Sequence, residues 1–282
     1  MNRTTYDHIP YGWGIRVIHQ DHTRLAGWWN GQPLYNDYWR LYYNFSEGAT
    51  IRLSSKTFEI PAHCATLIPS GLQATGYVEG GFMHYFVHFH VMGLPMALQG
   101  KMFPEPIHAR PCKHIDGLVE QWSTLANDED PRDVLPSYFL AESISAYVFA
   151  QCWHIHSINL STDWRLWRNH PSRLTRLHSW MENRLDEDLS VNRLAEQTGY
   201  SRDHFRRVFL EVYGVNPAEY VTQLRVREMT HLLLSSHYTI DEIAERTGMV
   251  DRHHMSRVFR KISGESPASY RKKNQFILNK IQ

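Results

Sequence analysis

The sequence is poor in cysteine and lacks a long apolar run. Its three cysteines, Cys64, Cys112 and Cys152, lie far apart, and this spacing fits neither a zinc site nor a disulfide framework. No stretch of about 18 apolar residues is present, so no membrane-spanning helix is predicted. The N-terminal residues also lack the apolar segment of a signal peptide. We therefore expect a reduced protein of the cytoplasm.

The sequence also lacks an excess of charge of one sign, since the chain of 282 residues carries a net charge of only +1. The charge is unevenly distributed: residues 1–170 hold 12 Lys and Arg against 15 Asp and Glu, whereas residues 171–282 hold 18 against 14. Eight of the nine tryptophans lie in the first of these regions. We infer two domains of different composition, and the basic C-terminal one is the candidate for binding nucleic acid.

The basic region contains a repeat of about fifty residues. Both copies share a Leu/Ile-Ala-Glu triplet, a Thr-Gly pair, an Arg-Val-Phe triplet and then Gly, Pro and Tyr. The first copy runs from Leu194 to Tyr220 and the second from Ile243 to Tyr270, with one additional residue after Gly248. A repeat that accepts an insertion only at its glycine turn predicts two helix–turn–helix units. Two such units in tandem indicate a protein that binds DNA.

Capping residues and apolar spacing predict helices on each part of this repeat, preceded by a helix from about Ser172. The expected N-caps are Ser190, Ser201, Thr239 and Asp251. A longer helix from Pro217 to about Leu234 would be roughly 27 Å long at 1.5 Å per residue. Such a rod can hold two recognition helices at a fixed separation, and successive major grooves on one face of DNA lie about 34 Å apart.

The second helix of each unit is predicted to have an apolar inner face and a polar outer face. In the first unit the inner residues are Phe205, Val208 and Phe209; in the second they are Met255, Val258, Phe259 and Ile262. Arginine dominates the outer face of the first unit, and its side chain suits guanine edges and phosphates. A basic helix from Pro267, ending in residues 271–273, closes the region and is expected either to contact phosphates or to be a solvated tail.

Residues 171–273 resemble the DNA-binding domain of the AraC/XylS family of bacterial transcription regulators. The segments that carry the resemblance are 190–195, 199–201 with Phe209, 240–244 with Gly248, 256–261 and 264–271. The one departure is Met249, where members usually carry an aromatic residue, and Met fills the same apolar position. The resemblance implies sequence-specific binding to double-stranded promoter DNA, usually by an activator that contacts RNA polymerase.

Position in that motif gives the candidate base-contacting residues. They are Arg202, Asp203, Arg206 and Arg207 in the first unit, and Arg252, His253, Ser256 and Arg257 in the second. A solvated helix face is the alternative for each arginine. Arg207 and Arg257 have a further alternative, since each is expected either to contact DNA or to brace its unit by pairing with Glu196 or Glu245, respectively. Asp203 is expected either to accept a hydrogen bond from cytosine or to orient Arg207.

The N-terminal region alternates short β-prone segments with Gly and Pro, a pattern typical of a small jelly roll or barrel. The predicted strands cover residues 14–19, 38–45, 50–53, 57–61, 65–69 and 82–91. Residues 65–71 and 86–89 resemble the cupin-like sensor domain of the same family. The predicted class is α+β, with a cupin-like ligand-sensing and dimerisation domain at 1–160, a linker at 161–170 and the DNA-binding domain at 171–282.

A barrel of this size holds one small ligand, and aromatic walls with a few polar groups suit sugars and similar polar molecules. The candidate ligand-binding residues are Trp13, Trp28, Trp29, Trp39, Arg40, Tyr42, His84 and His88. Packing in the core is the alternative for each aromatic residue. Arg40 is the first to test, because a buried arginine requires a partner.

Three histidines, His84, His88 and His90, share one face of a predicted strand. A metal-binding cupin also needs a glutamate on that strand pair and a histidine after the segment 69–71, and the sequence has neither. We therefore predict no metal, no cofactor and no catalytic residue.

Residues 114–157 are predicted to be helical, with two apolar stripes. The first stripe is Ile115, Leu118, Val119 and Trp122, and the second is Leu135, Tyr138, Phe139, Ile144, Tyr147, Val148 and Ala150. In the family, helices here often pair two subunits, so the resemblance implies a homodimer; packing on the barrel is the alternative.

The resulting hypothesis is a ligand-responsive, sequence-specific DNA-binding regulator, an activator of sugar or related carbon-source genes and not an enzyme. The alternatives are a cupin-type metalloenzyme with a regulatory DNA-binding tail and a DNA-binding regulator that needs no ligand.

Overall fold

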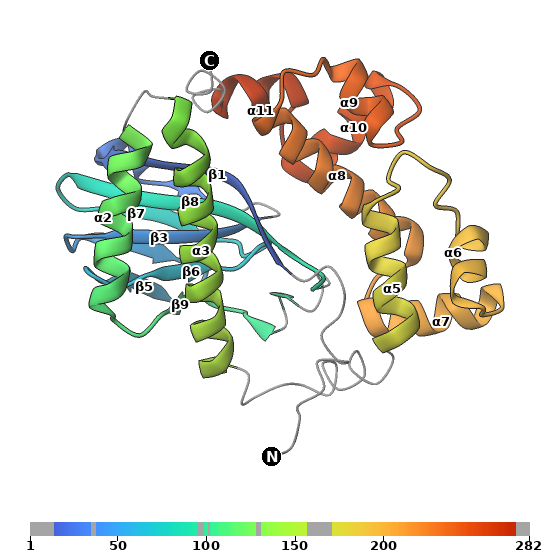
Figure 1. Cartoon of the computed structure of the whole chain (residues 1–282), viewed down its shortest axis with the longest axis horizontal. Helices are drawn as coiled ribbons and strands as arrows, with labels where there is room; N and C mark the ends of the chain where they lie inside the picture. The colour runs from blue at the N-terminus through green and yellow to red at the C-terminus, as the bar shows by residue number, and fades with distance from the viewer. Residues whose placement is uncertain are drawn as a thin grey trace. The chain divides into compact units, whose positions relative to one another are not determined.

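The computed structural model describes residues 14–34, 38–94, 99–100, 102–127, 131–156 and 171–274. Residues 15–91 and 99–156 of this set belong to one compact unit, built of strands followed by helices, and residues 171–274 belong to a second unit that is helical (Figure 1). The predicted α+β class is confirmed. The predicted linker at 161–170 lies outside the described residues.

Two β-sheets form the first unit. The five-stranded sheet has the order β1 (Gly14–Leu25), β8 (Phe82–Met92), β3 (Trp39–Asn44), β6 (Thr66–Ile68) and β9 (Ile107–His108). The four-stranded sheet has the order β2 (Gln32–Pro33), β7 (Thr75–Val78), β4 (Ala49–Arg52) and β5 (Thr57–Ile60). A short 3-10 helix, η2 (Gly27–Trp29), precedes β2. Strand β3 pairs antiparallel with both β6 and β8, so Tyr42 lies between Thr66 and Phe86.

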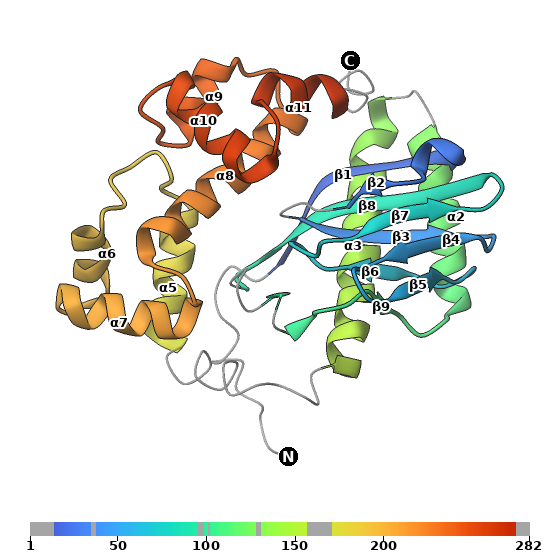
Figure 2. The same cartoon turned by 180° about the vertical axis from the view of Figure 1, so that it is seen from behind.

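Alternation along β3 divides its side chains between two layers. Tyr42 belongs to the core between the sheets, together with Leu25, Ile51, Ile60 and Val78. Trp39 points the other way and packs against Phe103 and Phe149. The outer face of the five-stranded sheet is covered by α2 (Lys113–Asn127) and α3 (Pro131–His156), as the two opposite views show (Figures 1 and 2).

The second predicted stripe, on α3, is wrong as a single stripe, because its members divide between opposite sides of the helix. Ile144 and Val148 are buried. Leu135, Phe139 and Tyr147 are 60%, 55% and 43% exposed. The sequence shows apolar residues on both sides of α3, and only packing against the sheet reveals which side is covered.

The second unit consists of seven helices within residues 171–274. They are α5 (Pro171–Glu182), α6 (Val191–Thr198), α7 (Arg202–Tyr213), α8 (Pro217–Ser235), α9 (Ile240–Arg246), α10 (Arg252–Ser263) and α11 (Pro267–Asn274). Helices α6 and α7 form the first predicted helix–turn–helix unit, and α9 and α10 form the second helix–turn–helix unit. None of the helices described along the chain has the length and apolarity that crossing a bilayer requires.

Local capping explains where most of these helices begin and end. Ser201 and Asp251 accept backbone N–H groups at the starts of α7 and α10, as predicted. Thr239 and Glu242 form a reciprocal capping box at the start of α9. Ser190 occupies the N-cap of α6, but its hydroxyl makes no capping bond and instead contacts Asp188 at 3.1 Å.

Candidate nucleic-acid interface and ligand-binding face

The first helix–turn–helix unit presents α7 as its outward helix. The inward side of α7 buries Phe205, Val208, Phe209, Val212 and Tyr213. The four candidate residues Arg202, Asp203, Arg206 and Arg207 are all exposed. Because Gly199 turns the chain at φ +68, α6 ends and α7 begins within four residues. The fold therefore holds three arginines on one solvent-facing side of a rigid helix.

The second unit repeats this arrangement with α10. Met255 and Phe259 are buried, whereas Val258 and Ile262 are only half-buried and so are less inward than predicted. Arg252, His253 and Arg257 are exposed, and Ser256 is half-buried.

Three exposed residues of the second unit were not singled out from the sequence as candidates. Arg260 and Lys261 extend the basic face into the last turn of α10. Val250, the additional residue of the second repeat, is 86% exposed just before Asp251. Arg260 and Lys261 could have been identified from the helical period, because they lie one turn after Arg257 on the same side of the helix.

Neither predicted bracing pair is formed within residues 171–274. Glu196 lies 3.8 Å from Arg193 on its own helix, and Arg207 lies 3.1 Å from His204 Nδ1. Glu245 and Arg257 are both exposed. Arg252 lies 3.6 Å from Asp241 of α9 instead. The ion pairs of the two units therefore differ from the predicted ones and from each other.

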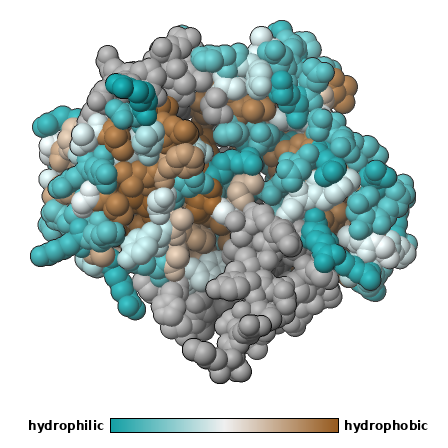
Figure 3. Space-filling model, viewed as in Figure 1, coloured by the Kyte–Doolittle hydropathy of each residue, from teal (hydrophilic) through white to brown (hydrophobic). Residues whose placement is uncertain are grey.

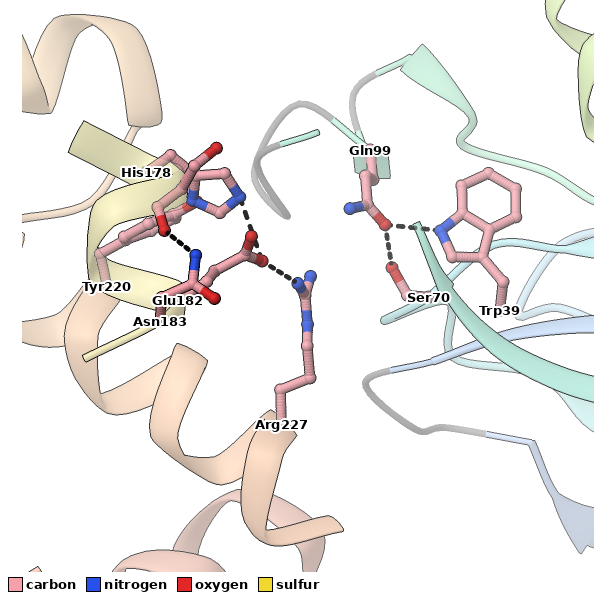
Figure 4. A network of polar contacts seen from close by, with 9 residues as sticks. Trp39, Ser70, Gln99, His178, Glu182, Asn183, Tyr220 and Arg227 are labelled. Carbon is pink, nitrogen blue, oxygen red and sulfur yellow. Dashed lines mark hydrogen bonds and ion pairs between the residues drawn. The ribbon is translucent and has the colours of Figure 1, made fainter. Parts of the chain in front are cut away.

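A buried polar cluster supports the first unit from behind (Figure 4). Glu182 of α5 lies 3.4 Å from Arg227 of α8 and 3.3 Å from His178. The other ring nitrogen of His178 lies 3.0 Å from the Tyr220 hydroxyl. Burial raises the pKa of Tyr220 well above its usual value, so the hydroxyl stays protonated. Since buried charges are tolerated only when paired, this cluster fixes α8 against α5.

Helix α8 connects the two units (Figure 1). Its 19 residues, from Pro217 to Ser235, correspond to a length of about 28 Å. Asn216 caps its start by accepting the Glu219 N–H, and Pro217 occupies its first turn. A continuous helix is stiff over this length, so α8 is a rigid connection between the units that carry α7 and α10.

In the N-terminal unit, four candidate ligand-binding residues lie together on the inner face of the five-stranded sheet. Arg40 pairs in register with His88, and Tyr42 with Phe86. His84 lies 4.5 Å from the Tyr42 ring centroid, and Trp29 lies 6.0 Å from His84. Five of the predicted residues, Trp29, Arg40, Tyr42, His84 and His88, are therefore brought together.

The other three predicted ligand residues do not belong to this face. Trp39 lies on the opposite side of β3, where its indole N–H donates to Gln99 Oε1 at 2.5 Å; that oxygen also accepts from the Ser70 hydroxyl (Figure 4). Trp28 is 55% exposed and its indole donates to the Arg24 carbonyl. Trp13 lies outside the described residues. The alternation of β3 separates Trp39 from Arg40, because neighbours in a strand face opposite ways.

The inner face is polar although it is buried. Arg40 is 3% exposed; it donates to the Leu34 carbonyl at 2.5 Å and lies 4.7 Å from the Tyr38 ring centroid. His84 donates from Nδ1 to Asn44 Oδ1 at 2.7 Å. Burial lowers the pKa of His84 to about 3, and burial followed by the Arg40 charge holds the pKa of His88 well below its usual value. Both imidazoles are neutral near pH 7 and can hydrogen-bond a polar ligand.

Among the described residues, no group of three or more His, Cys, Asp or Glu side chains is arranged to hold a metal ion. His84 and His88 instead have aromatic neighbours, including Phe86 between them on β8.

Two helix–turn–helix units, each with an exposed arginine-bearing helix and both joined by one rod, define a tandem DNA-binding domain. Residues 194–273 match the family model of a helix-turn-helix domain. The activator RhaS of Salmonella newport is 31% identical over 110 residues, which are 39% of this chain and 40% of that protein. These matches lie in the C-terminal region, which is similar to the DNA-binding domain of AraC/XylS transcription regulators, and they support a regulator of that family.

The chain matches only about two fifths of the length of these curated relatives. Over nearly the whole chain, the fold is similar to ToxT from Vibrio cholerae. One ToxT structure has a TM-score of 0.54 with 12% identity, covering 92% of this chain and 98% of that chain. Another, with a bound unsaturated fatty acid, has a TM-score of 0.53 with 10% identity and covers 96% and 97%. At these identities the likeness shows the fold alone.

Proposed function

We propose that the chain is a ligand-responsive regulator that binds one promoter site through both α7 and α10 in successive major grooves, and that it acts in the cytoplasm. The observation that carries this proposal is the equivalent placement of exposed arginines, Arg202 with Arg252 and Arg207 with Arg257, on two helices joined by α8. The rod, about 28 Å long, is of the order of the 34 Å between grooves. The candidate base contacts are those predicted from the sequence.

The test is selection of duplexes from a randomised library by the intact chain, followed by titration at several salt concentrations. We expect one selected sequence to bind at least about a thousandfold more tightly than random duplex, with affinity falling steeply as salt rises. Equal affinity for selected and random duplex would refute the proposal.

The effector proposed for the sandwich is a small polar molecule such as a sugar. Support comes from the buried polar side chains Arg40, Asn44 and His84 beside the aromatic rings of Trp29 and Tyr42. Such a ligand changes promoter occupancy only as far as its affinity differs between two states of the protein. At 100 times its Kd it stabilises the folded chain by about 2.7 kcal/mol. A thermal-shift panel of sugars and small carboxylic acids tests this, with Arg40→Met as the variant expected to lose the response.

We also infer a homodimer that activates transcription through contact with RNA polymerase. The exposed apolar side of α3, with Leu135, Phe139 and Tyr147, supports self-association, and an apolar area is visible over the face that carries α2 and α3 (Figure 3). Light scattering of the wild type and of Phe139→Glu tests the dimer. A monomeric wild type would refute it. The name of RhaS as an activator supports the direction of regulation.

A further inference from the structure

The glycine turns of the two units are equivalent in sequence but not in surroundings. Gly199 and Gly248 have φ values of +68 and +65, in the left-handed region that favours glycine. A Cβ on Gly199 would have Arg173 Nη1, at 3.8 Å, as its nearest neighbour. A Cβ on Gly248 would lie 2.2 Å from the Leu185 carbonyl oxygen and 2.6 Å from Arg225 Nη2. Only at the second turn, therefore, is another part of the domain packed too closely against the glycine to leave space for a Cβ.

The group that meets this turn is the guanidinium of Arg225, which projects from the connecting helix α8. Its Nε donates to the Leu185 carbonyl and its Nη2 to the Glu187 carbonyl, both at 3.0 Å. These carbonyls belong to the segment that follows α5, where Asp186 and Asp188 interact favourably with the arginine charge. Three segments thus converge: the chain after α5, the connector α8 and the turn of the second unit.

This convergence matters because α8 alone fixes the distance between the two helix–turn–helix units and not the orientation of one relative to the other. The second unit also attaches to the end of α8, through the bond from Arg271 Nε to the Leu233 carbonyl at 3.2 Å. The Arg225 junction adds a contact on the side of α8 toward the first unit. A planar guanidinium with two fixed donors holds both carbonyls in one geometry, which a lysine ammonium does not.

We propose that Arg225 is a positioning residue that fixes the orientation of α10 relative to α7 and thereby the number of base pairs accepted between the two half-sites. The proposal rests on the function proposed above, in which both units bind one duplex. Each base pair added between half-sites rotates one half-site by about 36° relative to the other. A rigid junction rejects such a change, whereas a loose one accommodates it.

The experiment uses the full chain and a duplex selected by the wild type from a randomised library. Footprinting locates the two half-sites, and derivative duplexes carry one base pair more or one fewer between them. For the wild type we expect about a hundredfold loss of affinity on either change. For Arg225→Met we expect about tenfold weaker binding to the selected duplex and less than about fivefold discrimination among spacings. Arg225→Lys is expected to resemble Arg225→Met.

Arg173→Met is the matched control, because Arg173 of α5 donates to the Thr198 carbonyl at 3.2 Å beside Gly199 and so braces the first turn without joining it to the second unit. We expect it to retain the wild-type spacing preference. Unchanged discrimination in a folded Arg225→Met chain overturns the proposal, and so does equal loss of discrimination in Arg173→Met. If Arg225→Met does not fold, Arg225→Gln, which keeps an amide donor, decides in the same way. A wild type that selects no sequence would instead refute the proposed function.

Discussion

The two helix–turn–helix units share a frame and differ in what supports it. Helix α7 buries five side chains, including Phe209, which stacks on Tyr213 with 4.3 Å between ring centroids. Helix α10 buries Met255 and Phe259, and Phe259 packs edge-on against Tyr270 of the short α11. The repeated residues therefore specify the glycine turn and one aromatic pair, because Phe209 contacts Tyr220 edge-on at 5.4 Å just as Phe259 contacts Tyr270. The stacking of Phe209 on Tyr213 is particular to the first unit.

The outward faces differ as well. Where α7 carries Leu210 and Glu211 in its last turn, α10 carries Arg260 and Lys261. The second unit thus presents more positive charge, which favours contacts to phosphate of any sequence, while the first presents a mixture that suits discrimination. Equivalent folds need not make equivalent contributions to binding, and paired substitutions in the two units can measure the difference.

The largest contrast is expected between ion pairs at different depths. Glu182→Leu leaves Arg227, 7% exposed, without its carboxylate partner, and should lower the free energy of unfolding by about 3–5 kcal/mol. In the second unit, Asp241→Asn removes a pair whose side chains are 63% and 59% exposed and should cost less than about 1 kcal/mol. Urea unfolding followed by circular dichroism measures both changes. Equal losses would show that the exposed pair of the second unit contributes as much stability as the buried Glu182–Arg227 pair, which would contradict the expected effect of burial.

The glycine turns give the next contrast. Gly248→Ala combines left-handed strain of about 1–2 kcal/mol with a clash against the Leu185 carbonyl, so we expect a total above about 2 kcal/mol. Gly199→Ala has the strain alone and should cost about 1–2 kcal/mol. Thermal unfolding of the two variants, prepared side by side, provides the measurement. A larger loss for Gly199→Ala would contradict the packing seen at Gly248.

Recognition at equivalent positions of α7 and α10 should also be unequal. Arg206→Ala should weaken binding to the selected duplex by about 1–3 kcal/mol and relax its sequence preference at one position. Ser256, at the equivalent position of α10, has a single hydroxyl, and its replacement by Ala should cost less than about 1 kcal/mol. Fluorescence anisotropy with selected and random duplexes separates specific from general loss. Unchanged affinity for Arg206→Ala would remove that residue from the interface.

The helices of the C-terminal domain were predictable because their signals are local. Ser201 and Asp251 cap the helices they were expected to cap, and the connector from Pro217 ends at Ser235, one residue beyond the expected Leu234. The role of Arg225 was not predictable, since its carbonyl partners lie 38 and 40 residues away and carry no side-chain signal. Backbone acceptors are identical at every residue, so only the fold identifies them.

The N-terminal unit was less predictable for a different reason. Strands β2 and β9 have two residues each, too few for any period to register. Alternation separates Trp39 from Arg40 into two groups, but it does not say which group faces the second sheet. Aromatic composition therefore placed Trp28, Trp29 and Trp39 together as candidates, and the structure retains only Trp29 beside His84.

The smallest contrast concerns the first helix of each unit. Thr239→Ala removes a capping box from α9 and should destabilise the chain by about 1 kcal/mol, whereas Ser190→Ala removes a hydroxyl that makes no capping bond and should cost a few tenths. Hydrogen bonds from Thr239 hold the pKa of Glu242 below its usual value. A depressed carboxyl pKa contributes stability above its unfolded value that is lost as pH falls through the folded one. Thr239→Ala removes the hydroxyl bond but keeps the backbone N–H, which is the larger cause of this shift, so it should raise the pKa of Glu242 only in part and flatten the acid side of the stability curve slightly. An NMR titration in which this pKa does not move at all would contradict the bond from the Thr239 hydroxyl.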